Sequence, residues 1–166
     1  MTATRLAVIG VAAAGKTAVG TDLARLLAAR FVDADDLHPP ANVAKMAAGT
    51  PLTDADRAPW LDAVGVELHG PAPVVVACSA LKRAYRDRLR RAGPDPVRFV
   101  LLDVSHATLD ARIRARPGHF MPPSLLDDQL RTLEPPALDE ADVIVVSAEA
   151  DLATVVADVA GTLGIS

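Results

Sequence analysis

Cysteine, aromatic residues and positive net charge are all scarce in this 166-residue chain. The single cysteine, Cys78, excludes an internal disulfide framework, and no Cys/His cluster indicates zinc, so we expect a reducing compartment, the cytoplasm. Aromatic residues make up 3% of the sequence, so the core must be aliphatic. The formal charge of −4 argues against a nucleic-acid binder, which needs a basic face to displace counterions from phosphates. We therefore expect small-molecule partners.

Long hydrophobic segments are also missing. The apolar run before Gly10 is too short for the apolar region of a signal peptide and far too short to cross a membrane. The length suits one ordinary domain, which we place over residues 1–166.

Short apolar runs alternate with longer stretches of helical period, which predicts repeated βα units and a parallel α/β sheet. We expect five parallel strands, at residues 6–9, 31–33, 74–78, 97–102 and 143–146. Core-facing helical stripes are predicted at Val19, Leu23, Leu26 and Leu27, and at Leu152, Val155, Val156, Val159 and Leu163.

Another helix should begin after Thr53, whose hydroxyl can cap it together with Asp56. Trp60 on this helix is expected in the core rather than as a stacking platform. Four proline-rich patches, HPPAN, GPAP, MPPS and EPPAL, are interpreted as loops.

The segment GVAAAGKT at residues 10–17 predicts a phosphate-binding loop between a strand and a helix. The spacing places backbone N–H groups at a helix N-terminus, where the macrodipole and unpaired donors attract phosphate. Lys16 would reach the β- and γ-phosphates of ATP, and Thr17 would hold Mg²⁺. Three alanines fill the loop, and alanine resists positive φ. We therefore expect the loop to turn at Gly10 and Gly15, with residues 12–14 at negative φ.

Acidic residues follow the second predicted strand, at Asp33 and Asp35 in FVDADD. This position lies beyond the carboxyl end of the strand, where open α/β sheets bind ligands. In an extended segment the two carboxylates share a face, so one can order Mg²⁺ while the other accepts a proton from a hydroxyl. Asp103, at another strand end, is a rival metal ligand. The acids favour a small-molecule kinase over an ATPase, whose Mg²⁺-ordering aspartate usually ends a later strand.

Basic residues follow the third and fourth predicted strands. Lys82 and Arg86 are four apart on the helix after Ser79, so they share a face and could point to an anionic substrate. Arg112 and Arg116 repeat at helical spacing before a Pro-Gly break, a pattern typical of a flap that brings guanidinium charge to a transferring phosphoryl group. Four other arginines, at positions 83, 88, 90 and 91, are interpreted as solvated.

Histidines offer weaker candidates. His38 and His119 lie in predicted loops near the site and are candidates for substrate hydrogen bonds, whereas His69 and His106 are expected at the surface.

Three longer stretches carry a family resemblance: DADDLHPPANVAKMAAGTPLTDADRAPWL, ACSALKRAYRDRLR and RPGHFMPPSLLDDQLRTLEPPALDEAD. From residue 6 to about residue 146, the chain resembles the gluconate kinases, P-loop enzymes that phosphorylate gluconate at its terminal hydroxyl. The resemblance implies a nucleoside-monophosphate-kinase-like fold with strand order 2-3-1-4-5 and a lid at about residues 112–135. It also implies ATP and Mg²⁺ as cofactors, 6-phosphogluconate as product and a homodimer.

The same resemblance implies roles for individual residues. Asp35 would partner the acceptor hydroxyl, Asp33 would lie near Mg²⁺, and residues 112–121 would close over the site. The assignments are Lys16, Asp35 and Arg116 for catalysis; Gly10, Ala12, Ala13, Ala14, Gly15, Lys16, Thr17, Ala18 and Arg112 for the nucleotide; Asp35, His38, Arg57, Lys82, Arg86 and His119 for the acceptor; and Thr17 and Asp33 for the metal.

The phosphate loop departs from the family pattern, which usually reads Gly-Val-Ser-Gly-Ser-Gly-Lys-Ser-Thr. Ala12 and Ala14 replace serines, Ala13 a glycine and Ala18 a threonine, and Ala34 elsewhere replaces a common glycine. Two alternatives to a gluconate kinase stay open: a kinase for another small acceptor, such as shikimate or a nucleoside monophosphate, and a non-catalytic ATP-binding regulator.

Overall fold

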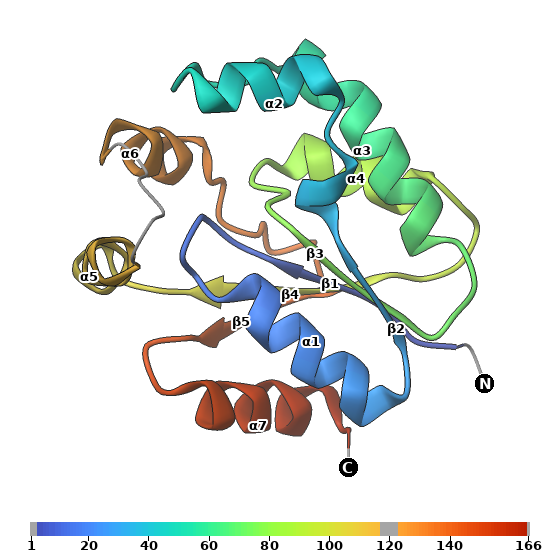
Figure 1. Cartoon of the computed structure of the whole chain (residues 1–166). Coiled ribbons are helices and arrows are strands. Elements are labelled where there is room, and N and C mark those ends of the chain that lie inside the picture. The colour runs from blue at the N-terminus through green and yellow to red at the C-terminus, as the bar shows by residue number, and fades with distance from the viewer. Residues whose placement is uncertain (1–2, 117–122, 166) are drawn as a thin grey trace.

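The computed structural model describes residues 3–116 and 123–165, in which five parallel strands form one sheet in the order β2-β3-β1-β4-β5 (Figure 1). The strands are β1 (Arg5–Ile9), β2 (Arg30–Asp33), β3 (Val74–Cys78), β4 (Arg98–Asp103) and β5 (Val143–Ser147). The predicted fold class and strand order are confirmed, and the predicted strand ends are correct to within one residue.

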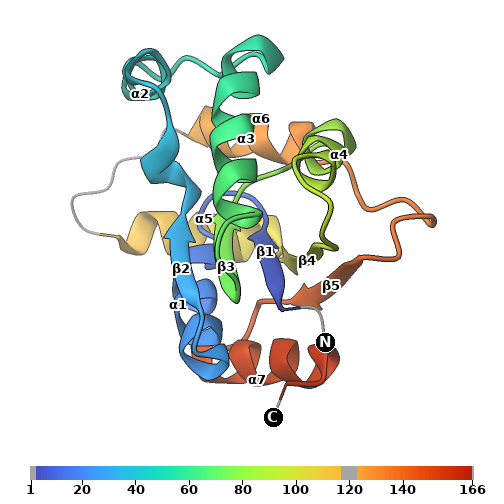
Figure 2. The same ribbon diagram turned by 90° about the vertical axis from the view of Figure 1, so that its right-hand side faces the viewer.

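Helices cover both faces of the sheet. They are α1 (Lys16–Leu27), α2 (Pro40–Ala47), α3 (Asp54–Leu68), α4 (Arg83–Arg91), α5 (His106–Ala115), α6 (Pro123–Thr132) and α7 (Leu152–Leu163), with a short 3₁₀ helix, η1 (Ala34–Leu37). Helices α1 and α7 lie on one face, and α3 and α4 on the other (Figure 2). Helices α5 and α6 lie past the carboxyl ends of the strands (Figure 1).

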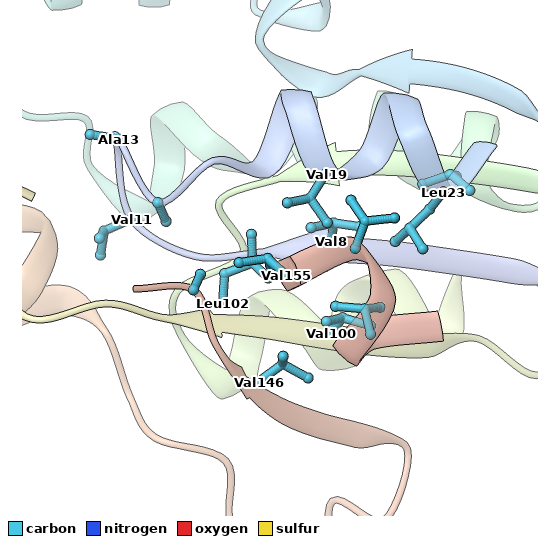
Figure 3. Packing of buried hydrophobic residues seen from close by; sticks show 14 of the residues in the cluster. Val8, Val11, Ala13, Val19, Leu23, Val100, Leu102, Val146 and Val155 are labelled. Carbon is cyan, nitrogen blue, oxygen red and sulfur yellow. The ribbon is translucent and has the colours of Figure 1, made fainter. Parts of the chain in front are cut away.

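The core follows from the two-residue period of the strands. On β1, Leu6 and Val8 join the cluster beneath α1 and α7, whereas Ala7 and Ile9 join the cluster beneath α3 and α4. Figure 3 shows the first cluster, with Val8 on the sheet beside Val19 of α1. Strands β1 and β3 are covered on both faces, and their sequences are therefore almost entirely apolar.

The predicted helix after Thr53 is confirmed. The Thr53 hydroxyl accepts from the Asp56 backbone N–H at 3.1 Å, and the Asp56 carboxylate accepts from the Thr53 N–H at 2.8 Å, which completes a capping box. Trp60 is buried in the second cluster, as predicted.

Several local expectations were wrong. Leu26 and Leu152 are 54% and 42% exposed, because each lies at the edge of its helical stripe rather than at its centre. Two of the proline patches are not entirely loops, since α2 begins at Pro40 and α6 at Pro123. Proline is tolerated in a first helical turn, where its missing N–H would have no helical partner. Within the described residues, no helix is long and apolar enough to cross a membrane.

Candidate active site

The phosphate loop joins β1 to α1 and turns at three residues with positive φ. Gly10 and Gly15 have φ of 151° and 97°, as predicted, but Ala13 also turns, at φ 66°. The prediction of negative φ for residues 12–14 is therefore wrong at Ala13. The Ala14 N–H donates to the Val11 carbonyl at 3.2 Å, and the Ala13 side chain packs into the core. This packing holds alanine in a conformation that costs about 1–3 kcal/mol.

Lys16 and Thr17 open α1 beside the carboxyl end of β2. The Lys16 ammonium donates to the Val11 carbonyl at 2.9 Å, across the mouth of the loop. Burial lowers the pKa of Lys16, and the carboxylates of Asp35 and Asp33 oppose that shift. The Thr17 hydroxyl donates to Asp33 Oδ2 at 2.9 Å. The loop thus brings a cation and a hydroxyl close to the acids that follow β2.

The prediction that Asp33 and Asp35 share one face of an extended segment is wrong. The chain turns into η1 directly after Asp33, whose Oδ1 accepts from the Asp35 backbone N–H at 3.0 Å. Asp33 therefore faces Thr17, while the Asp35 side chain lines a separate cavity with Lys16. The turn gives the two acids different neighbours.

The cavity that contains Asp35 measures about 540 Å³ and lies at the carboxyl ends of the strands. The phosphate loop, η1, α3 and α6 all line it, together with the loop between β3 and α4 and the first turn of that helix. Its polar lining residues are Lys16, Asp35, His38, Thr50, Thr53, Asp54, Arg57, Ser79, Lys82, Tyr85, Asp128, Gln129 and Thr132. A volume of this size suits a small polar acceptor beside the phosphate loop.

A hydrogen-bonded cluster of Asp54, Arg57, Lys82 and Tyr85 forms one wall of this cavity. Arg57 Nη1 donates to the Tyr85 hydroxyl at 2.9 Å, and Lys82 donates to Asp54 at 3.2 Å. The Tyr85 hydroxyl also donates to Asp54, and these contacts hold the pKa of the Asp54 carboxyl below its usual range. The wall places two cations and one carboxylate at the cavity.

His38 stacks on the indole of Trp60, with ring centroids 4.4 Å apart and planes 10° from parallel. The expectation that Trp60 is only a core residue was therefore incomplete. Burial lowers the pKa of His38, Asp35 opposes the shift, and Arg57 reinforces it. The Trp60 indole N–H donates to the Ala34 carbonyl at 2.7 Å, which ties this stack to η1.

Arg86 does not face the cavity, so its predicted role as a substrate-side cation is wrong. It is fully buried, and its guanidinium forms two hydrogen bonds with Glu140, each 2.8 Å long. Lys82 is the residue before α4 and has an extended backbone, so it does not share a helical face with Arg86. Arg90, one of the four arginines expected to be solvated, lies 2.8 Å from Glu140 and pairs with it as well. These arginines of α4 thus form ion pairs within the protein instead of facing a substrate.

A second cavity, of about 290 Å³, lies on the other side of the phosphate loop. Residues that line it include Ala13, Ala14, Gly15, Ala18, Arg112, Arg116, Ala148 and Val155. Arg112 donates to the Ala13 and Ala148 carbonyls at 3.2 and 2.6 Å, which links the loop to the chain after β5. The structure therefore brings the predicted nucleotide residues Ala18 and Arg112, and the predicted catalytic Arg116, to one side of the loop.

Residues of the site that the sequence did not reveal include Asp54, Tyr85 and Gln129. Asp54 begins the capped helix, and a signal was available in its position next to Arg57 at helical spacing. Gln129 accepts from the Ala12 backbone N–H at 2.7 Å across 117 positions, and nothing local in the sequence indicates that contact. The predicted His119 lies outside the described residues, as does part of the predicted lid.

The remaining candidates fall outside both cavities. Cys78 is buried, and desolvation raises the pKa of its thiol to about 12, so the thiol is a core group rather than a nucleophile. His106 is exposed, as expected, whereas His69 is half-buried and its Nε2 donates to the Leu89 carbonyl at 2.9 Å. Asp103 ends β4 with an exposed side chain.

Comparison with known proteins adds three observations. A family model described as an AAA domain matches residues 6–136. A gluconokinase of Gluconobacter oxydans 621H is 52% identical over 149 residues, 87% of this chain and 82% of that protein. The thermosensitive gluconokinase of Escherichia coli K12 is 42% identical over 151 residues, 89% of this chain and 80% of that protein.

Solved structures agree with these matches. The crystal structure of a gluconokinase from Sinorhizobium meliloti 1021 superposes with a TM-score of 0.90 at 45% identity, covering 97% of this chain and 91% of that one. Shikimate kinase from Aquifex aeolicus gives a TM-score of 0.63 at 18% identity, covering 97% and 96% of the two chains, which supports the fold alone.

Proposed function

The chain belongs to the gluconokinase family, and from this premise we propose that it transfers the γ-phosphoryl group of ATP to the terminal hydroxyl of gluconate, giving 6-phosphogluconate. The observation that carries the proposal is the 540 Å³ cavity, which Lys16 of the phosphate loop lines together with Asp35 and the cations Arg57 and Lys82. A sugar acid needs a cation for its carboxylate and an acceptor for its reacting hydroxyl, and this cavity offers both.

Asp35 is the residue that we assign to the acceptor hydroxyl. Its exposed carboxylate lines the cavity beside Lys16, so it can orient the hydroxyl and accept its proton as the oxygen attacks the γ-phosphorus. Phosphoryl transfer proceeds through a loose transition state, so positioning matters more than base strength. His38, stacked on Trp60, supplies a further hydrogen-bonding group beside Asp35.

Arg57 and Lys82 are assigned to the gluconate carboxylate. Asp54 lies 3.2 Å from Lys82 and 3.9 Å from Arg57, and this spacing of the two cations supports the assignment of one carboxylate to both. A charge-assisted contact from Arg57 would fix the far end of the acceptor. Arg86 is left out of this role because it is buried against Glu140.

The phosphate loop is assigned to the triphosphate. Lys16 would exchange its hydrogen bond with the Val11 carbonyl for the β- and γ-phosphates, where it stabilises negative charge in the transition state. The 290 Å³ cavity on the other side of the loop, lined by Ala18, Arg112 and Arg116, is assigned to the nucleoside. Arg116, at the end of α5, is the cation that we assign to the transferring phosphoryl group.

Magnesium is assigned to Thr17 and Asp33, whose oxygens lie 2.9 Å apart beside the loop. Oxygen ligands suit Mg²⁺, which keeps several waters and is usually held by one or two protein groups plus substrate phosphates. Within residues 3–116 and 123–165, no group of three His, Cys, Asp or Glu side chains is placed to hold a metal, which agrees with a site completed by ATP. When bound, Mg²⁺ neutralises charge on the β- and γ-phosphate oxygens.

An acceptor panel tests this proposal. ADP release from ATP and Mg²⁺ would be measured with gluconate, shikimate, a nucleoside monophosphate and no acceptor. We expect strong stimulation by gluconate alone. Stimulation by another acceptor would assign this chain to a different small-molecule kinase reaction, and ATP binding without turnover on any acceptor would support the non-catalytic regulator.

The homodimer implied by the family resemblance is also proposed for this chain. Light scattering coupled to size-exclusion chromatography would measure its mass in solution, and a mass near that of one chain would contradict the dimer.

A further inference from the structure

Gln129 of α6 forms a contact between the two halves of the site. Its Oε1 accepts from the Ala12 backbone N–H at 2.7 Å. A backbone N–H can only donate, so the carboxamide atom that faces it must be the oxygen, and this fixes the orientation of the amide. The Nε2 group, with two N–H donors, is therefore directed away from Ala12.

The contact lies where the phosphate loop meets the acceptor cavity. Ala12 and Gln129 both line that cavity, together with Lys16 and Asp35. The Ala12 N–H belongs to the loop whose amides we assign to the phosphates, on the side of the loop that faces the acceptor. Gln129 thus touches the loop at the place where the γ-phosphoryl group and the acceptor hydroxyl must meet.

Core packing and hydrogen bonds hold helix α6 in place, and with it the contact between Gln129 and Ala12. Leu126 is 2% exposed and packs into the same core cluster as Val11 and Ala13 of the loop. Just past the helix, the Glu134 N–H donates to the Leu81 carbonyl at 2.8 Å, and the Glu134 carboxylate accepts from the Arg83 N–H at 2.9 Å. The helix is therefore tied to the loop that carries Lys82 of the acceptor wall.

We propose that Gln129 is a positioning residue that couples acceptor binding on α6 to the alignment of the phosphate loop. Its Oε1 accepts from the Ala12 amide, and its side chain lines the acceptor cavity. An acceptor that contacts Gln129 would therefore hold the phosphate loop in place relative to the reacting hydroxyl. The inference rests on the proposed function, because the coupling concerns transfer to gluconate. Misplacement of reacting groups by about 1 Å can cost about 10²-fold in rate, which sets the size of the expected effect.

Two variants of Gln129 test the role. Gln129→Met keeps the length and bulk of the side chain but removes both hydrogen-bonding groups. Gln129→Glu keeps an oxygen that accepts from the Ala12 N–H but replaces the Nε2 donors with a second, negatively charged oxygen. Asp127→Asn is the matched control, because Asp127 lies on the same helix, contacts exposed His106 at 3.2 Å and does not line the cavity.

The readouts are ADP release with saturating gluconate, ADP release without it, both KM values and the Tm. For Gln129→Met we expect kcat with gluconate to fall by about 10²-fold and acceptor-free ATP hydrolysis to fall by a clearly smaller factor. Gln129→Glu should retain more of the gluconate stimulation than Gln129→Met and should raise the KM for ATP, since it places a negative charge beside the phosphate loop. Asp127→Asn should match the wild type.

Three results would overturn the inference: a Gln129→Met enzyme with kcat within threefold of wild type, an equal fall in acceptor-free hydrolysis, or a kcat loss that follows a lowered Tm. The first would show that the contact does nothing, the second that Gln129 serves only the nucleotide, and the third that it serves only the fold. A wild-type enzyme without gluconate stimulation would contradict the proposed function itself, and the coupling with it.

Discussion

The nucleotide side and the acceptor side of this site differ in how the chain builds them. On the nucleotide side, one continuous segment from Gly10 to Ala18 supplies the loop, the lysine and the hydroxyl, and Arg112 supports it from behind. On the acceptor side, the cavity draws its polar groups from η1, α3, the chain around Lys82, α4 and α6. The nucleotide side is built mainly by one short segment, whereas the acceptor side is built by segments that lie far apart in the sequence.

The two regions also differ in what determines the position of a cationic side chain. Lys16 is placed by the helix that it begins, so its role follows from its position in the loop. On the acceptor side, Arg57 reaches the cavity, whereas Arg86 of α4 is buried against Glu140. Burying a charge is tolerable only when a partner is present, and Glu140 supplies that partner from 54 positions away. A cation's role on this side therefore depends on which distant carboxylate it meets.

The strongest test of the nucleotide side is Lys16→Ala. We expect kcat to fall by about 10³-fold or more, because the variant loses a charge that stabilises the transferring phosphoryl group. Steady-state ADP release would measure the loss, and the thermal unfolding curve would check that the fold is intact. Turnover near that of the wild type would remove Lys16 from the reaction.

Asp35→Asn tests the acceptor side with a slightly smaller effect. The variant keeps the shape of the side chain but loses the charge that orients the hydroxyl and takes its proton, so kcat should fall by about 10²- to 10⁴-fold. ATP binding, measured by isothermal titration, should persist because Asp33, not Asp35, contacts Thr17. Asp36→Asn is the control, since Asp36 does not line the cavity. Loss of ATP binding in Asp35→Asn would mean that Asp35 serves the nucleotide rather than the acceptor.

Arg57→Ala separates the two sides through their KM values. A hydrogen bond to a charged group contributes about 1.5–3 kcal/mol, so we expect the KM for gluconate to rise by about 10- to 100-fold and that for ATP to change little. Arg88→Ala is the matched control, because Arg88 pairs with exposed Asp62 outside the cavity. Equal increases in both KM values would contradict an acceptor role for Arg57.

Ala13→Gly has the smallest expected effect and tests the loop itself. Glycine relieves the positive φ of residue 13 but loses a packed methyl group and adds freedom to the unfolded chain, so the free energy of unfolding should change by less than about 1 kcal/mol. ATP affinity should change by less than about tenfold. Chemical denaturation would compare this variant with Ala14→Gly.

The Ala14→Gly control has no strain to relieve, since residue 14 is not among the positive-φ positions and is 1% exposed. It should therefore be less stable than Ala13→Gly. The reverse order would mean that positive φ at Ala13 costs the folded protein nothing.

Much of the fold was predictable because it depends on short-range patterns. Apolar runs flanked by breakers located every strand to within a residue, and the capping box at Thr53 and Asp56 fixed the start of α3. The strand order was predicted from the family resemblance and is confirmed. The errors at Leu26 and Leu152 lie at the edges of helical stripes, where periodicity alone does not decide exposure.

Local patterns in the sequence located the phosphate loop, the acids after β2 and Lys82 after β3, because each depends on a motif or follows a strand end. Arg57, inside α3, was assigned only through the family resemblance. Tertiary structure alone decided that Ala13 turns at positive φ, that Arg86 pairs with Glu140 and that Gln129 reaches Ala12. These outcomes depend on contacts between segments far apart in the chain. Packing and the pairing of buried polar groups select them, and no local pattern of residues encodes either one.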